Sequence, residues 1–145
     1  MSGGMTGAVV RLLLPASLMV AAATLVKGYA DTGDGFSAGI VIALGVLVQY
    51  VAFGAATARR LAIVRYAPQL IAAGLLLALS VAFLPMLAGD PVMTHRPAPG
   101  AKVVHIGAVE GLTAALFDVG VLLIVLGFSV TAFDLATALR ERGRT

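Results

Sequence analysis

The chain has 145 residues, of which 60% are hydrophobic and only 12% are charged. An ordinary soluble domain carries about 25% charged residues, so the composition excludes this class and indicates a protein whose main solvent is lipid. The absence of cysteine excludes disulfides and thiolate metal sites. The arginines behind the formal charge of +3 stand at the ends of apolar runs, so we expect no nucleic-acid partner.

Four apolar runs are long enough to cross a bilayer as helices, which takes about 20 predominantly apolar residues. Lipid offers no partners for backbone polar groups, so each run must satisfy them internally as a helix. The sequence therefore predicts an all-α integral membrane protein with four transmembrane helices in a single membrane domain. We expect these helices at residues 8–26, 36–58, 67–88 and 112–136, with an external loop at 89–111.

The first run has a second interpretation as a cleaved signal peptide. Gly28 and Ala30 are small residues at plausible cleavage positions. Against cleavage stand the weakly basic start, with Arg11 alone, and Lys27 just before the cut. We favour a retained first helix.

The lysines and arginines predict the orientation of the four helices. The N-terminus, the second connection and the tail hold seven of them, whereas the other side of the membrane would hold three. The seven are Arg11, Arg59, Arg60, Arg65, Arg140, Arg142 and Arg144. Basic residues favour the cytoplasmic side, so we expect both termini inside.

The long external loop is broken by prolines and contains or borders both histidines, His95 and His105. Ten residues of proline-broken chain separate the two histidines, and no third ligand stands at helical spacing. We therefore expect solvated side chains here and no metal site.

The second helix carries small residues that would let another helix approach closely. Gly35, Gly39 and Ala43 are spaced four apart near its outer end, and Gln49 lies in its inner half. The amide of Gln49 needs a hydrogen-bond partner in lipid. Helix packing is the favoured role for Gln49, with contact to a transported substrate as the alternative.

The fourth helix carries small and polar residues on two opposed faces. Thr113, Gly120, Gly127 and Asp134 share one face, while Asp118 lies about 200° from Gly120 around the helix. A four-helix monomer in lipid needs only one packing face per helix, so two faces predict a partner subunit.

Asp118 is expected about six residues below the outer end of this helix, where a charge is costly to bury. Such a residue either pairs with a buried cation or hydroxyl, or belongs to an ion or proton path, and both roles stay open. Glu110, eight residues earlier, either supplies ions to Asp118 or sits in water at the helix start, where the helix dipole favours a carboxylate.

Residues 28–39, GYADTGDGFSAG, resemble the glycine-rich turn G-H-x-x-P-G-G-G-F-x-x-G of the B subunit of Mrp-type (Mnh) cation/proton antiporters, which are multi-subunit bacterial complexes. The matching residues are Gly28, Gly33, Gly35, Phe36 and Gly39. Tyr29, Thr32 and Asp34 stand where the family has histidine, proline and glycine, so no role of that histidine is carried over.

A second motif, at residues 110–127, is similar to the family helix that begins at a glutamate and contains F-D-x-G-V. Glu110, Phe117, Asp118 and Gly120 match it. The loop at residues 91–95 also resembles a family loop, and the resemblance covers the whole chain.

The resemblance implies a small subunit of a Na⁺ (or other monovalent cation)/H⁺ antiporter complex in the bacterial cell membrane, with the other subunits as partners and no cofactor. One alternative is the related small subunit of a membrane-bound hydrogenase or other complex-I-like redox complex. Another is a structural protein in which Asp118 only holds a neighbouring helix. An enzyme is not expected, because nothing in the sequence pairs a nucleophile with a base.

Overall fold

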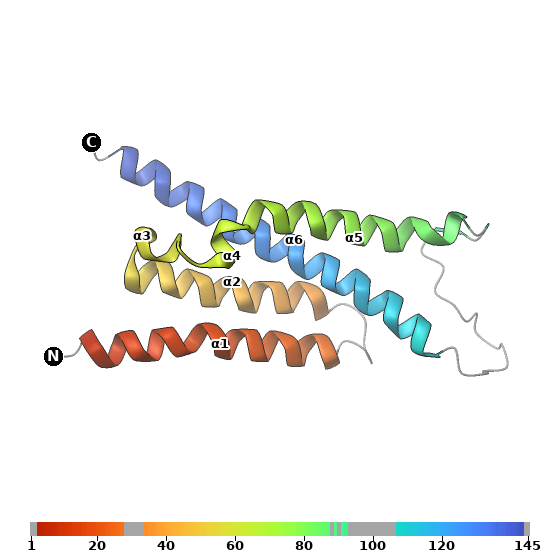
Figure 1. Ribbon diagram of the computed structural model, residues 1–145, viewed down its shortest axis with the longest axis horizontal. Helices are drawn as coiled ribbons and strands as arrows, with labels where there is room; N and C mark the ends of the chain where they lie inside the picture. The colour runs from red at the N-terminus through yellow and green to blue at the C-terminus, as the bar shows by residue number, and fades with distance from the viewer. Residues whose placement is uncertain (1–2, 28–33, 88, 90, 93–106, 144–145) are drawn as a thin grey trace.

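The computed structural model is all-helical, as predicted, over the residues it describes (Figure 1). These are residues 3–27, 34–87, 89, 91–92 and 107–143, with the backbone alone for Gly3 and residues 107–112. The helices are α1 Gly3–Lys27, α2 Asp34–Phe53, α3 Ala55–Ala58, α4 Ala62–Arg65, α5 Ala67–Leu87 and α6 Gly107–Arg142. Four of them, α1, α2, α5 and α6, are long and apolar enough to cross a membrane, which confirms the four predicted spans.

The second membrane helix is shorter than predicted, because α2 ends at Phe53 and not at Ala58. Gly54 has a φ angle of 77°, in the left-handed region that glycine adopts without steric cost. Residues 54–58 are small and carry no charge, so hydropathy alone continues the helix through them. The chain instead turns at Gly54 and forms the short helices α3 and α4 before α5 begins at Ala67.

The fourth membrane helix is longer than the predicted 112–136. With 36 residues, α6 is about 54 Å long at 1.5 Å per residue, whereas the hydrocarbon core of a bilayer is about 30 Å thick. Figure 1 shows α6 crossing the other helices obliquely, with its C-terminal end diverging from them. The helix α6 is therefore longer than the hydrocarbon core is thick.

The long helices pack in the order α1, α2, α6, α5, so that the last helix of the chain lies between α2 and α5. The first turn of α2 lies against Asp118, and Tyr50 near its other end binds Asp134, so α2 and α6 run in the same direction. The start of α1, the short helix α3 and the end of α6 gather at one end of the molecule, whereas α4 and the start of α5 lie further in along α2 (Figure 1).

This order corrects one inference from the sequence. The face of α6 that contains Asp118 packs on α2, and the face that contains Gly120 and Gly127 packs on α5. Both small-residue faces are therefore covered within the chain, and they do not by themselves require another subunit.

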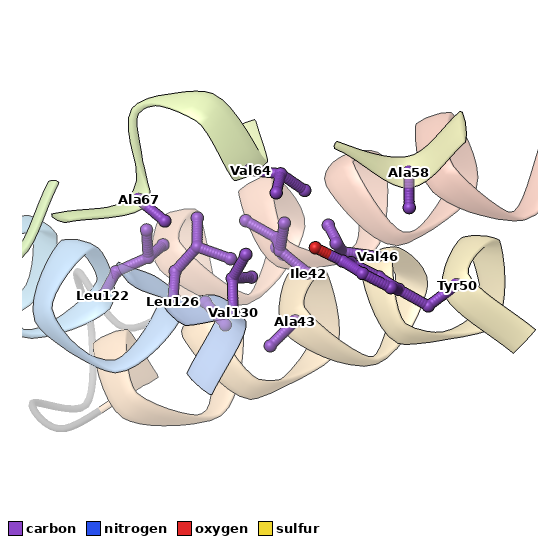
Figure 2. Packing of buried hydrophobic residues seen from close by; sticks show 12 residues of the cluster. Ile42, Ala43, Val46, Tyr50, Ala58, Val64, Ala67, Leu122, Leu126 and Val130 are labelled. Atoms are coloured by element: carbon purple, nitrogen blue, oxygen red, sulfur yellow. The ribbon is translucent and has the colours of Figure 1, made fainter. Parts of the chain in front are cut away.

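The apolar core lies along the seam between α2 and α6 and is closed on one side by α4. Val64 of α4 packs with Ile42 and Val46 of α2 and with Leu126 and Val130 of α6 (Figure 2). Val46 and Val130 are fully buried. These contacts place the α2–α6 pair at the centre of the molecule.

Candidate functional site

The helices α2 and α6 approach each other very closely where α2 begins, at Gly35. A Cβ atom added to Gly35 would collide with the carbonyl oxygen of Asp118 and lie 2.7 Å from its carbonyl carbon and 2.9 Å from its Cα. All three atoms belong to the main chain, which cannot rotate away. Only glycine permits this contact between α2 and α6.

Gly39, one turn further along α2, continues the same contact. An added Cβ would lie 3.0 Å from the carbonyl oxygen of Leu122 and 3.0 Å from Cβ of Val125. Ala43, the third small residue of the series, is only 4% exposed. The Gly35–Gly39–Ala43 series thus lies on the side of α2 that packs within the chain, with its two glycines against α6.

The opposite face of α6 uses two glycines of its own against α5. A Cβ on Gly127 would lie 2.6 Å from the carbonyl oxygen of Ala67, and one on Gly120 would lie 3.0 Å from that of Gly74. Gly74 is itself buried against α6, so glycine meets glycine at this crossing. Small residues on both helices allow the backbones to approach, as is typical of membrane helix pairs.

Asp118 is buried at the α2–α6 crossing, with a residue exposure of 7%. Because α6 begins at Gly107, Asp118 lies 11 residues into the helix, about 16 Å along it, and not the six residues expected from the sequence. Its main chain is level with the first turn of α2, where a helix has unpaired N–H groups and a partial positive charge. The surroundings of Asp118 thus include a feature that favours a carboxylate.

The other residues singled out in the sequence are placed differently. Phe36 is 54% exposed, whereas Phe117 is half-buried on α6. Glu110 lies in α6, but its side chain is outside the described part of the structure, as are Gly33, His95 and His105. Among the described residues no group of three or more His, Cys, Asp or Glu side chains could hold a metal ion.

Gln49 joins α2 to α1. Its Nε2 donates a hydrogen bond of 2.7 Å to the carbonyl oxygen of Val10, and the residue is only 6% exposed. Nearby, Gly45 leaves room for Ser17 of α1, because a Cβ on Gly45 would lie 3.0 Å from that of Ser17. The partner of the Gln49 amide is therefore a main-chain group of this chain, which favours the packing role.

A polar cluster of Tyr50, Arg59, Asp134 and Glu141 lies at the end of the molecule where both termini gather. Oδ1 of Asp134 accepts hydrogen bonds from the Tyr50 hydroxyl, at 2.9 Å, and from Nε of Arg59, at 2.7 Å. Nη1 of Arg59 also donates to Oε2 of Glu141 at 3.2 Å. The Tyr50 ring packs edge-on against Phe133, with ring centroids 5.3 Å apart.

This cluster fastens the connection between α2 and α5 to the end of α6. The Arg59 and Asp134 side chains are each about one-third exposed, at 34% and 35%, so the pair is partly screened by solvent. Hydrogen bonds to Asp134 and then to Glu141 are the main causes that raise the pKa of Arg59 above its ordinary value. Nη2 of Arg59 is buried without a hydrogen-bond partner among the described residues.

Sequence reasoning missed this cluster, because Arg59 and Asp134 are 75 residues apart. The sequence contains only a weak indication of this cluster. Asp134 and Glu141 are seven residues apart, which places them on one face of a helix, in a segment otherwise rich in arginine.

These features define a small multi-pass helical membrane protein whose helices are joined by glycine contacts and by one polar cluster at an end. A family model described as "Domain related to MnhB subunit of Na+/H+ antiporter" matches residues 5–131. The match covers most of the chain, and the chain therefore belongs to this family.

Three curated relatives agree with this assignment. The chain is 33% identical over 104 residues to the B subunit of a Na(+)/H(+) antiporter from Alkalihalophilus pseudofirmus, which covers 72% of this chain and 71% of the relative. It is 30% identical over 105 residues to the B subunit of a Na(+)/H(+) antiporter from Bacillus subtilis, covering 72% of each. It is 32% identical over 123 residues to the probable A/B subunit of a K(+)/H(+) antiporter from Rhizobium meliloti, covering 84% of this chain but only 12% of that relative.

Proposed function

We propose that the chain is a small membrane subunit of a hetero-oligomeric monovalent cation/proton antiporter, needed for assembly and for exchange by the complex. The observation that carries the proposal is the family match over residues 5–131. Two relatives are named for Na⁺ and one for K⁺, so the proposal specifies a monovalent cation and not one ion.

The proposed principal neighbour is a long antiporter subunit. In the Rhizobium meliloti relative, a segment similar to this chain forms 12% of a longer polypeptide that is named as a combined A/B subunit. Two parts of one polypeptide stay close to each other, so a separate chain of this family is expected to bind the corresponding longer subunit.

The proposed location is the bacterial cell membrane, with both termini in the cytoplasm. The start of α1, the connection between α2 and α5 and the end of α6 carry six of the basic residues, Arg11, Arg59, Arg60, Arg65, Arg140 and Arg142. Concentration of basic residues at one membrane face favours the cytoplasmic side.

The proposed role of Asp118 is contact with the ion pathway of the complex. It is the only charged residue buried in the described part of the chain, and it lies beside the first turn of α2. Buried carboxylates in membrane helices commonly mark ion or proton paths. Glu110, earlier on α6, is the proposed companion toward the outer end of the helix.

The test is purification of the chain with an affinity tag after Thr145, in mild detergent, followed by identification of the co-purified polypeptides. Vesicles from cells with and without the chain are then compared for cation/proton exchange. Recovery of antiporter subunits and loss of exchange without the chain are expected. Recovery of hydrogenase subunits would instead support the redox-complex alternative and contradict the proposal.

A further inference from the structure

A groove of about 490 Å³ runs along the seam between α2 and α6. It is lined by Ile40, Leu44 and Leu47 of α2 and by Ser129, Ala132 and Ala136 of α6, among others. A space of this order holds a drug-sized ligand, so it can also accept several side chains of a neighbouring helix.

The two sides of the α2–α6 seam differ in whether another helix of the chain covers them. On one side, Val64 of α4 closes the core over Ile42 and Val130 (Figure 2). On the other side, every residue that lines the groove belongs to α2 or α6, and no other described helix contributes to it. The chain therefore covers one side of its central helix pair and leaves the groove open.

The α2 side of the groove belongs to an apolar stripe that follows the whole helix. Phe36, Ile40, Leu44, Leu47 and Val51 are spaced four, four, three and four residues apart, so they share one face. Phe36 is 54% exposed, Leu44 55% and Val51 82%. This stripe includes Phe36, a motif residue that is more than half exposed.

On the α6 side, three of the four residues that line the groove are small, and the fourth is Phe133. Ser129, Ala132 and Ala136 follow at spacings of three and four, which gives a low surface next to the large residues of α2. Small residues on a membrane helix let a second backbone approach and gain van der Waals contacts. Phe128 and Leu135, 64% and 60% exposed, stand beside Ala132 and extend the apolar surface.

We infer that this groove binds one transmembrane helix of the long antiporter subunit. The inference rests on the proposed function, which makes that subunit the neighbour, and on the surface described here, which gives the position of contact. A ridge of large side chains beside a row of mostly small ones forms a groove, and a single helix can pack its own side chains into such a groove.

Photo-crosslinking in the intact complex tests this position. Leu44 is replaced by a photoreactive phenylalanine analogue in the tagged full-length chain, and the adduct formed in native membranes is identified by mass spectrometry. The expected adduct joins this chain to the long antiporter subunit. Adducts with lipid alone or with a second copy of this chain would overturn the inference.

Matched substitutions provide the second arm. Ala132→Phe fills the groove and is expected to abolish most of the Leu44 adduct and to lower recovery of the complex several-fold. Ala23→Phe, at an exposed alanine of α1, adds the same side chain elsewhere and is expected to leave the adduct unchanged.

The two proposals fail in different ways. If antiporter subunits co-purify with the chain but Leu44 gives no adduct with the long one, the groove assignment is wrong and the proposed function stands. If no antiporter subunit co-purifies, the proposed function fails and the groove assignment fails with it.

Discussion

At the scale of single residues, glycine at position 35 determines how closely α2 and α6 approach. Gly35→Ala adds one methyl group against the main chain of Asp118, which must move to make room. Overpacking in a well-packed interior costs roughly 1–3 kcal/mol. We expect a lower thermal midpoint of the purified complex, measured by fluorescence-detected gel filtration after heating. Gly4→Ala, where an added Cβ meets nothing within 4 Å, is the control.

Two substitutions at Asp118 distinguish the role of its charge from the role of its shape. Asp118→Asn keeps the shape and hydrogen bonding but loses the charge and the proton site, so we expect normal recovery of the complex and depressed exchange. Asp118→Glu keeps the charge and should retain more exchange. The measurements are complex yield and cation/proton exchange in vesicles for both variants. Reduced yield for Asp118→Asn would assign a structural charge partner instead, because removing one member strands the other in low dielectric.

At the scale of helices, the contact between Arg59 and Asp134 fixes the path of the chain from α2 to α5. Asp134→Arg or Arg59→Asp alone places two like charges together and should lower the thermal stability of the complex. The double variant restores opposite charges and should recover part of the lost stability. If the two residues did not interact, the destabilising effects of the single variants would simply add in the double variant. Arg60→Asp, at an exposed arginine next in sequence, is the control.

The helices and their contacts also show what the sequence can and cannot predict. Each of the four apolar runs yields a membrane-length helix because length and hydropathy decide that outcome locally. The predicted end of α2 was wrong because Gly54 stands among small apolar residues, and only its positive φ angle ends the helix. The partner of Gly35 and the Arg59–Asp134 pair depend on which helices become neighbours, and hydropathy contains no such information.

At the scale of the whole molecule, the gathering of both termini at one end allows a direct test of orientation (Figure 1). A reporter active only in the cytoplasm, fused after Thr145, should be active, and one active only outside should be active when inserted near Pro97. The expectation follows from the seven basic residues proposed to lie inside. Activity of the outside reporter at the tail would reverse the assignment.

The position of α6 between α2 and α5 also sets an order of events during synthesis. Proteins are made from the N-terminus, at about 5–20 residues per second, so α2 and α5 enter the membrane before their common neighbour exists. Until α6 arrives, Gly35 and Gly74 lack the helix against which they pack, and α2 has no helix to join it to α5. Completion of the last helix is therefore the step at which the glycine contacts of α2 and α5 can form.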